Sequence, residues 1–97
     1  MSKGYIVVTY RKVKDPVKFA AYAKLAGLSI AASGGRVLVR GLPVETDELG
    51  VMERTVVVEF PDVAAASAQH HSAAYQEALR VLDDGAERDV RICEGVG

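Results

Sequence analysis

Apolar side chains recur along the chain with two different periods, and this contrast predicts the secondary structure. Four short runs are rich in β-branched and aromatic residues, which is typical of strands. These runs cover residues 5–13, 36–41, 54–60 and 87–94. The intervening segments instead repeat apolar residues at helical spacing, from residue 16 to the glycines at 34 and 35, from 63 to about 71, and from 73 to 82.

The longest helical segment carries signals at both ends. Asp15 can cap its free N–H groups, and Pro16 suits the first helical position because that position needs no N–H donor. Gly34 and Gly35 are expected to end the helix with positive φ. One face collects apolar side chains, namely Phe19, Tyr22, Ala23, Ala26 and Ile30.

The two shorter helices each follow a capping residue. Asp62 comes directly after Pro61, which cannot continue a strand ladder, and it can cap the helix at 63–71. Ser72 can cap the helix at 73–82. This position explains Ser72 better than a nucleophilic role, which would require a base within reach and an acid behind that base.

The predicted order of elements is β-α-β-β-α-β, which is the ferredoxin-like pattern. A chain of this class is α+β and forms one antiparallel sheet with its helices on one face. The polar segment 42–53 is expected to be a long hairpin loop, part of which could extend the second strand. Residues 1–97 are expected to form a single domain of this kind.

The sheet is predicted to have two partly apolar faces. Along the first strand Val7 alternates with Ile6 and Val8, and along the third strand Val57 alternates with Val56 and Val58. Both faces of the sheet are therefore expected to be partly apolar, including the face without helices. An uncovered apolar face indicates a partner surface. A second copy packed sheet to sheet about a two-fold axis is the simplest cover. The alternative is a monomer whose outer face is only moderately apolar.

Composition narrows the classes of function. The 97 residues carry 12 basic and 13 acidic side chains, interspersed, so no nucleic-acid footprint is visible. The single cysteine, Cys93, fits a reducing compartment. The first apolar run is too short to span a bilayer and charge follows it directly, so no membrane association is expected and the predicted location is cytoplasmic. No dinucleotide, P-loop or flavin fingerprint is present, and no cofactor is expected.

Five stretches together resemble the domain-of-unknown-function family thirteen-thirty, a member of the dimeric α/β-barrel superfamily. They are GYIVV, DPVKFAAYAK, ASGGRVLVRG, VVVEFPD and SAAYQEAL, in that order along nearly the whole chain. The resemblance implies a ferredoxin-like protomer that forms a two-fold homodimer with facing sheets. Relatives in the superfamily include cofactor-free monooxygenases, lactone isomerases, haem-handling enzymes and stress-responsive proteins. They share a cleft between the sheet and the helices, but they have no common set of catalytic residues.

Two adjacent histidines, His70 and His71, lie where one predicted helix ends and the next begins. Imidazole is a common general acid or base near neutral pH. Adjacent helical residues point about 100° apart, so these two are not expected to bind one metal ion together. In the structural alternative, His71 joins the buried stripe with Tyr75 while His70 faces water.

The second strand carries two arginines, Arg36 and Arg40, which strict alternation places on one face. An arginine there could hold a carboxylate. It could equally pair with Glu59 or Glu53 on the neighbouring strand. Glu59 lies in an apolar strand, where a carboxylate could serve as a base.

These residues support two hypotheses of different kinds. In the first, a modest, partly apolar carboxylate or phenolate binds in a cleft, where it could also react without a cofactor. His71 or Glu59 would then move a proton, and Arg40, His70, Tyr10 and Tyr75 would contact the ligand. In the second, the chain is a non-catalytic module that only dimerises. The first requires polar side chains aimed into a cavity, whereas the second lets them pair with one another.

Overall fold

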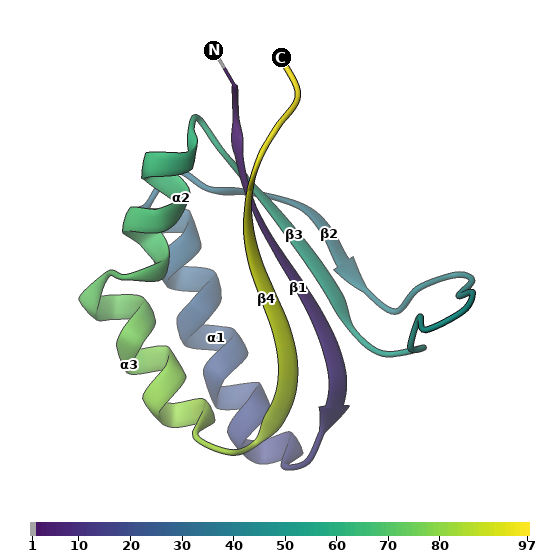
Figure 1. The fold of residues 1–97 in the computed structure, drawn as a ribbon. Coiled ribbons are helices and arrows are strands. Elements are labelled where there is room, and N and C mark those ends of the chain that lie inside the picture. The colour runs from purple at the N-terminus through teal and green to yellow at the C-terminus, as the bar shows by residue number, and fades with distance from the viewer. Residues whose placement is uncertain (1) are drawn as a thin grey trace.

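A computed structural model describes residues 2–97, which form a four-stranded antiparallel sheet covered on one face by three helices (Figure 1). In chain order the elements are β1 (Gly4–Val13), α1 (Pro16–Ala32), β2 (Arg36–Gly41), β3 (Thr55–Phe60), α2 (Val63–His70), α3 (Ala73–Leu82) and β4 (Ala86–Glu94). The strand order is β2-β3-β1-β4. The structure therefore confirms the ferredoxin-like α+β fold that the hydrophobic pattern predicts.

The helix starts are the ones that the capping residues predict. The side chains of Asp15, Asp62 and Ser72 each accept hydrogen bonds from backbone N–H groups in the first turn of α1, α2 and α3. Ser72 Oγ accepts from the N–H of Tyr75 at 3.2 Å. The capping role predicted for Ser72 is confirmed, and this cap fixes the turn of α3 that carries Tyr75.

The two glycines after α1 have different reasons to be glycine. Gly34 has φ +76°, a left-handed conformation that glycine adopts without strain. Gly35 does not have positive φ, so that prediction was wrong for it. A Cβ at Gly35 would lie 2.9 Å from Ile30 Cγ2 and from the ring of Phe60. Gly35 is therefore needed for the close approach of α1 to β3.

Two groups of buried side chains lie on the helical side of the sheet. One group joins the sheet to α2 and consists of Ile6, Val8, Tyr10, Val58, Phe60 and Ala66. The other joins α1 to α3 and consists of Tyr22, Ala26, Tyr75, Ala78 and Leu82. Because the helix pair and the strands each have their own core, space remains between them over β1, β2 and β3.

The pairing of β2 with β3 contains a register shift between Val37 and Val39. Arg36 pairs with Glu59, whereas Arg40 pairs with Val56, whose side chain faces the helices. Leu38 is the extra residue of a β-bulge. The prediction that Arg36 and Arg40 share one face was therefore wrong, because the bulge places Arg40 on the helical side and leaves Arg36 on the open side.

The face of the sheet without helices carries a row of valines across three strands. Val57 pairs with Val39 on one side and with Val7 on the other. Val39 is exposed, and Val7 and Val57 are partly buried. The β2–β3 loop projects away from the helices (Figure 1) and exposes apolar side chains, notably Leu42, Val44 and Leu49.

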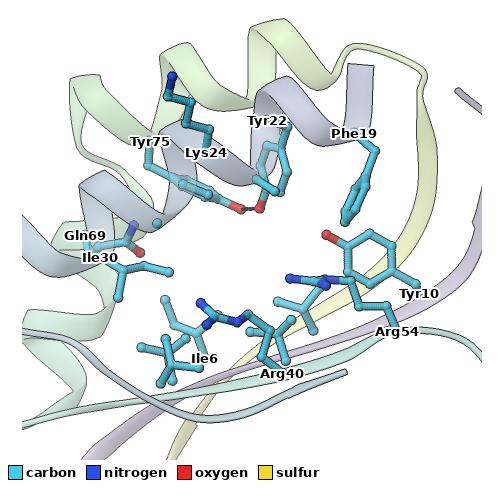
Figure 2. Close-up of a pocket in the computed structure, with 17 residues that line it drawn as sticks. Ile6, Tyr10, Phe19, Tyr22, Lys24, Ile30, Arg40, Arg54, Gln69 and Tyr75 are labelled. Atoms are coloured by element: carbon cyan, nitrogen blue, oxygen red, sulfur yellow. Dashed lines mark hydrogen bonds between the residues drawn. The ribbon is translucent and has the colours of Figure 1, made fainter. Parts of the chain in front are cut away.

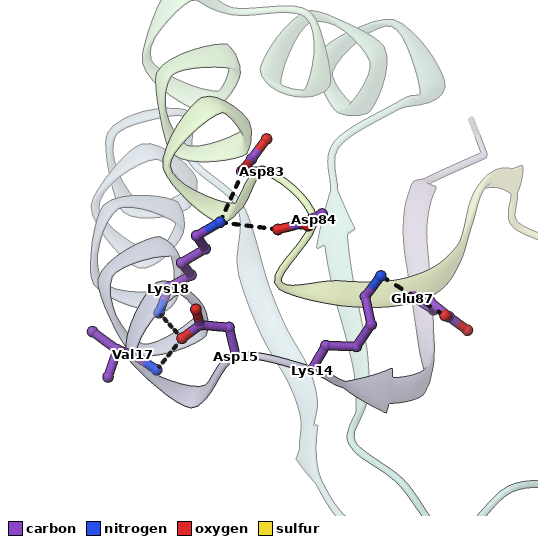
Figure 3. A network of polar contacts seen from close by, with 7 residues as sticks. All are labelled: Lys14, Asp15, Val17, Lys18, Asp83, Asp84 and Glu87. Carbon is purple, nitrogen blue, oxygen red and sulfur yellow. Dashed lines mark hydrogen bonds and ion pairs between the residues drawn. The ribbon is translucent and has the colours of Figure 1, made fainter.

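The start of α1 is tied to the turn after α3 by a lysine clamp (Figure 3). Lys18 Nζ donates to Asp83 Oδ2 and Asp84 Oδ1, each at 2.9 Å. The backbone N–H of Lys14 also donates to the carbonyl of Gly85 at 2.7 Å. These contacts hold α1 and α3 side by side, and this fixes the relative positions of the aromatic side chains that the two helices direct at the sheet.

None of the helices described within residues 2–97 combines the length and the apolar character that crossing a bilayer requires.

Candidate functional site

A cavity of about 360 Å³ lies between α1, α3 and the helical face of the sheet (Figure 2). Its walls are largely apolar, with Ile6, Val8, Val56 and Val58 from the strands and Ile30 from α1. Alternation along β1 and β3 aims these side chains at the helices. The polar part of the lining comes from a few tyrosines, basic side chains and one glutamine.

Two tyrosine hydroxyls meet at the helical side of the cavity. Tyr22 Oη from α1 and Tyr75 Oη from α3 are 2.8 Å apart (Figure 2). Arg88 on β4 donates from Nη1 to Tyr22 Oη at 2.8 Å, and its guanidinium lies 5.0 Å from the centre of the Tyr22 ring. The pair is thus backed by a fixed positive charge that is itself half-buried.

Burial raises the pKa of Tyr22, and the proximity of Tyr75 raises that pKa further. The Arg88 guanidinium offsets part of this rise by favouring the phenolate. Tyr22 is therefore a neutral phenol at physiological pH, and its O–H bond is polarised by the adjacent cation.

The opposite wall supplies basic side chains. Figure 2 shows Arg40 and Arg54 extending from the sheet towards the tyrosine pair. The Arg54 guanidinium lies 5.2 Å from the centre of the Phe19 ring, a cation–π arrangement that holds it in place. Lys24 also contributes to the lining, but its ammonium group points away from the cavity.

Gln69 closes the end of the cavity near α2. It is buried, and its Nε2 donates to the hydroxyl of Ser29, which is buried as well, at 3.1 Å. Two polar groups from different helices thus satisfy each other there. This end of the cavity is consequently a wall and offers few free donors.

The two histidines lie opposite to the structural alternative, which placed His71 on the buried stripe and His70 in water. His71 is exposed, and its Nδ1 lies 2.9 Å from the backbone carbonyl of Ser67, so it finishes α2. His70 is half-buried, with its ring 5.2 Å from the ring of Tyr75. Neither histidine lines the cavity. The expectation that His71 lies on the buried stripe was therefore wrong, because α2 buries the face of Ala66 and Gln69 and leaves the face of Ala64 and Ala68 exposed.

The proton chemistry of His70 differs from that of a free imidazole. Its Nδ1 is buried and has no hydrogen-bond partner among the described residues. Burial lowers the pKa of His70, and the nearby charges of His71 and Arg88 lower it further. His70 supports Tyr75 from behind, on the side away from the cavity.

Glu59 faces the opposite side of the sheet. Its carboxylate accepts a hydrogen bond from Tyr5 Oη at 3.0 Å, and Lys3 Nζ is 3.9 Å away. The structure thus brings Arg40, Tyr10 and Tyr75 to one cavity but leaves Glu59 and His71 outside it. The catalytic roles assigned to Glu59 and His71 stay predictions.

Within residues 2–97, no three side chains of histidine, cysteine, aspartate or glutamate come close enough together to hold a metal ion.

A family model matches residues 3–96, and its description is "Domain of unknown function (DUF1330)". The chain belongs to this family. It is the family that the five sequence stretches resemble. A search of curated proteins gave no match.

Solved structures similar to this DUF1330 protein share its fold at low sequence identity. The RPA0582 protein of unknown function from Rhodopseudomonas palustris has 17% identity and a TM-score of 0.74, covering 99% of this chain and 84% of its own. A dimeric ferredoxin-like protein of unknown function from Thermobifida fusca has 12% identity and a TM-score of 0.64, covering 95% and 90%. An antibiotic biosynthesis monooxygenase-like protein from Nitrosomonas europaea has 17% identity and a TM-score of 0.61, covering 100% of both chains.

Three cavity-related residues were missed as functional candidates in the sequence, although a signal was present for each. Arg54 shares the alternation of Val56 and Val58, and this alternation directs it to the helical face. Arg88 likewise precedes Val90 by two residues on β4. Tyr22 was identified only as a core residue because helical periodicity shows burial but does not reveal a cavity beside it.

Proposed function

We propose that this DUF1330 protein binds a small, partly apolar anion, a carboxylate or a phenolate, in the cavity between its sheet and its helices. The cavity of about 360 Å³ is within the range of about 300–1,000 Å³ that is typical of ligand pockets. Its apolar walls suit an aromatic or aliphatic body. A few convergent polar groups then orient the ligand.

The positive charge of the cavity lining is the main observation that supports this proposal. Arg40 and Arg54 extend into the cavity, while the lining contains no aspartate, glutamate or histidine. Paired surface arginines usually have carboxylate neighbours, but neither Arg40 nor Arg54 has an ion pair within the described residues. Their unused donors match the planar, bidentate geometry of a carboxylate.

The ligand charge can be tested with two matched probes, 1-naphthoate and 1-naphthalenemethanol, titrated by NMR. We expect naphthoate to bind more tightly, and Arg54→Gln to weaken its binding by about tenfold, or about 1.4 kcal/mol. Arg80→Gln is the control because Arg80 is exposed on α3 and pairs with Glu77. If the alcohol bound as well as the carboxylate in the parent protein, a site for anions would be excluded.

The proposal extends to chemistry on the bound molecule without a cofactor. The monooxygenase-like neighbours share only the fold with this chain, so they are a reason to test turnover and they do not specify a reaction. A native mass spectrum would first identify a ligand that the purified protein retains. Incubating the protein with an excess of that ligand and following its loss would then separate binding from turnover.

A homodimer through the open face of the sheet is the second part of the proposal. The row of Val39, Val57 and Val7 would meet its copy about a two-fold axis. The exposure of β2 and the dimeric state of the Thermobifida fusca neighbour both support this assembly. If no ligand is found, dimerisation through this face stands as the alternative function, that of an interaction module.

A further inference from the structure

The protons of the tyrosine pair leave one donor free. Tyr22 and Tyr75 carry one hydroxyl proton each, and their mutual hydrogen bond at 2.8 Å uses one of them. Arg88 donates an N–H hydrogen bond to Tyr22 Oη, so this contact uses neither hydroxyl proton. Whichever tyrosine donates to the other, one O–H group remains, and no acceptor among residues 2–97 takes its proton.

That free donor lies at the cavity wall, since both tyrosines line the cavity. A buried hydroxyl proton is stable only when an acceptor satisfies it. Figure 2 shows the hydroxyl pair facing the space between helices and sheet, with Tyr10, Arg40 and Arg54 around the same space. A molecule bound in the cavity can supply that acceptor.

The charges around the pair decide what kind of acceptor it is. The groups facing it are Tyr10 from β1, Arg40 from β2, Arg54 before β3 and Arg88 from β4. From the helices come Gln69 at the cavity wall and His70 behind the Tyr75 ring. All the formally charged groups among them are cationic. An oxygen that becomes negative would be stabilised here by a donated proton and by positive charge.

We propose that the Tyr22–Tyr75 pair, backed by Arg88, binds the oxyanion of an acidic hydroxyl compound, a phenol or an enol, and so draws the ligand into its ionised form. This rests on the proposed anion binding and names its ligand class. The ligand hydroxyl loses its proton to solvent on binding, because no carboxylate or imidazole lines the cavity to take it. The resulting oxyanion accepts a hydrogen bond from the free tyrosine O–H group, which keeps its proton. Arg88 acts through Tyr22 as a positioning residue.

The probe is 4-nitrophenol, whose ionised form has a visible absorption band that the neutral form lacks. In a buffer on the acid side of its free ionisation, adding the protein should produce this band. We expect the pKa of the bound probe to fall by about one unit, which is about tenfold in ionisation. 4-Nitroanisole has no hydroxyl proton to lose, and it should bind about tenfold more weakly than the phenol at neutral pH.

Substitutions distinguish the contributions of the two tyrosines to ionisation of the probe. Tyr22→Phe removes the hydroxyl to which Arg88 donates at 2.8 Å and should abolish the induced band, as should Arg88→Gln. Tyr75→Phe should retain most of it, because Tyr22 then keeps both its arginine donor and its own free proton. Arg80→Gln, which removes the same charge from the exposed face of α3, should leave the band unchanged. Circular dichroism confirms that each variant is folded.

The parent protein alone decides the inference if the variants at Tyr22 and Arg88 do not fold, because the comparison of phenol with anisole needs no substitution. Binding of 4-nitrophenol without the band, or equal binding of 4-nitroanisole, would overturn the oxyanion site. In that case continued binding of 1-naphthoate would leave the proposed anion binding intact. If neither naphthoate nor nitrophenol bound, both proposals would fall.

Discussion

His70 shows how one side chain can couple stability to pH without taking part in a site. Its ring packs on Tyr75, and its Nδ1 is buried without a partner among the described residues. Burial is the main reason that its pKa lies below the usual 6.5, and the charges of His71 and Arg88 add to the effect. The unfolded chain therefore binds a proton at His70 more readily than the folded protein does.

The free energy of unfolding should consequently fall as the pH drops through 6.5, and it should level off below the lowered folded-state pKa. We expect His70→Phe, which keeps the ring against Tyr75, to flatten this dependence. Urea unfolding at fixed protein concentration, from neutral pH to about pH 5, would measure it. His71→Gln should change the dependence only slightly, because burial and not the charge of His71 is the main cause of the lowered pKa of His70. An unchanged slope in His70→Phe would show that other groups cause the pH dependence.

At the scale of single elements, α1 meets two different demands at its glycines. Gly27 lies within the helix, and a Cβ there would have no atom within 4 Å. Gly35 lies just beyond the helix end, against Ile30 and the almost fully buried ring of Phe60. The first position has room for a side chain, whereas the second does not.

Gly27→Ala should therefore stabilise the protein by about 0.5–1 kcal/mol, because alanine loses less backbone entropy in a helix. Gly35→Ala should destabilise it by about 1–3 kcal/mol, because the added methyl overpacks the contact with Phe60. Urea unfolding of the two variants in parallel tests both signs. Equal effects at the two positions would rule out this account of the close approach between α1 and β3.

Sequence patterns were sufficient to predict the helices and strands, but they predicted only part of the candidate site. Caps such as Asp15 and Ser72 act on neighbouring residues, so local sequence reveals them, and every predicted strand and helix is present. The cavity depends on contacts between residues far apart in the chain. The Arg88–Tyr22 hydrogen bond joins residues 66 positions apart, and no local period encodes it.

At the scale of the whole molecule, the proposed ligand binding and the proposed association use opposite faces of the sheet. The helical face holds the cavity, and the open face carries the row of Val7, Val57 and Val39. The proposed dimer would use only the open face. Ligand binding and association should therefore be separable by mutation.

Val57→Asp puts a charge at the centre of the valine row and should convert a dimer to a monomer that still binds 1-naphthoate. Burying an unpaired carboxylate against a second copy is unfavourable, whereas water solvates it in the monomer. Light scattering coupled to size-exclusion chromatography would give the masses. Val17→Asp is the control because Val17 is 80% exposed on α1. A monomeric parent protein would refute the dimer, and a dimeric Val57→Asp would refute this face as its interface.

The bulge at Leu38 determines which of these tasks Arg40 can serve. If Leu38 were paired in a regular ladder, Arg40 would share the face of Arg36, and the cavity would lose a cation to the association surface. A single additional backbone residue thus moves a charge from one face of the sheet to the other without any change in side-chain chemistry. When family members are aligned, the length of β2 should therefore be as informative as the identity of its residues, since a conserved arginine is equivalent only where the bulge is conserved too.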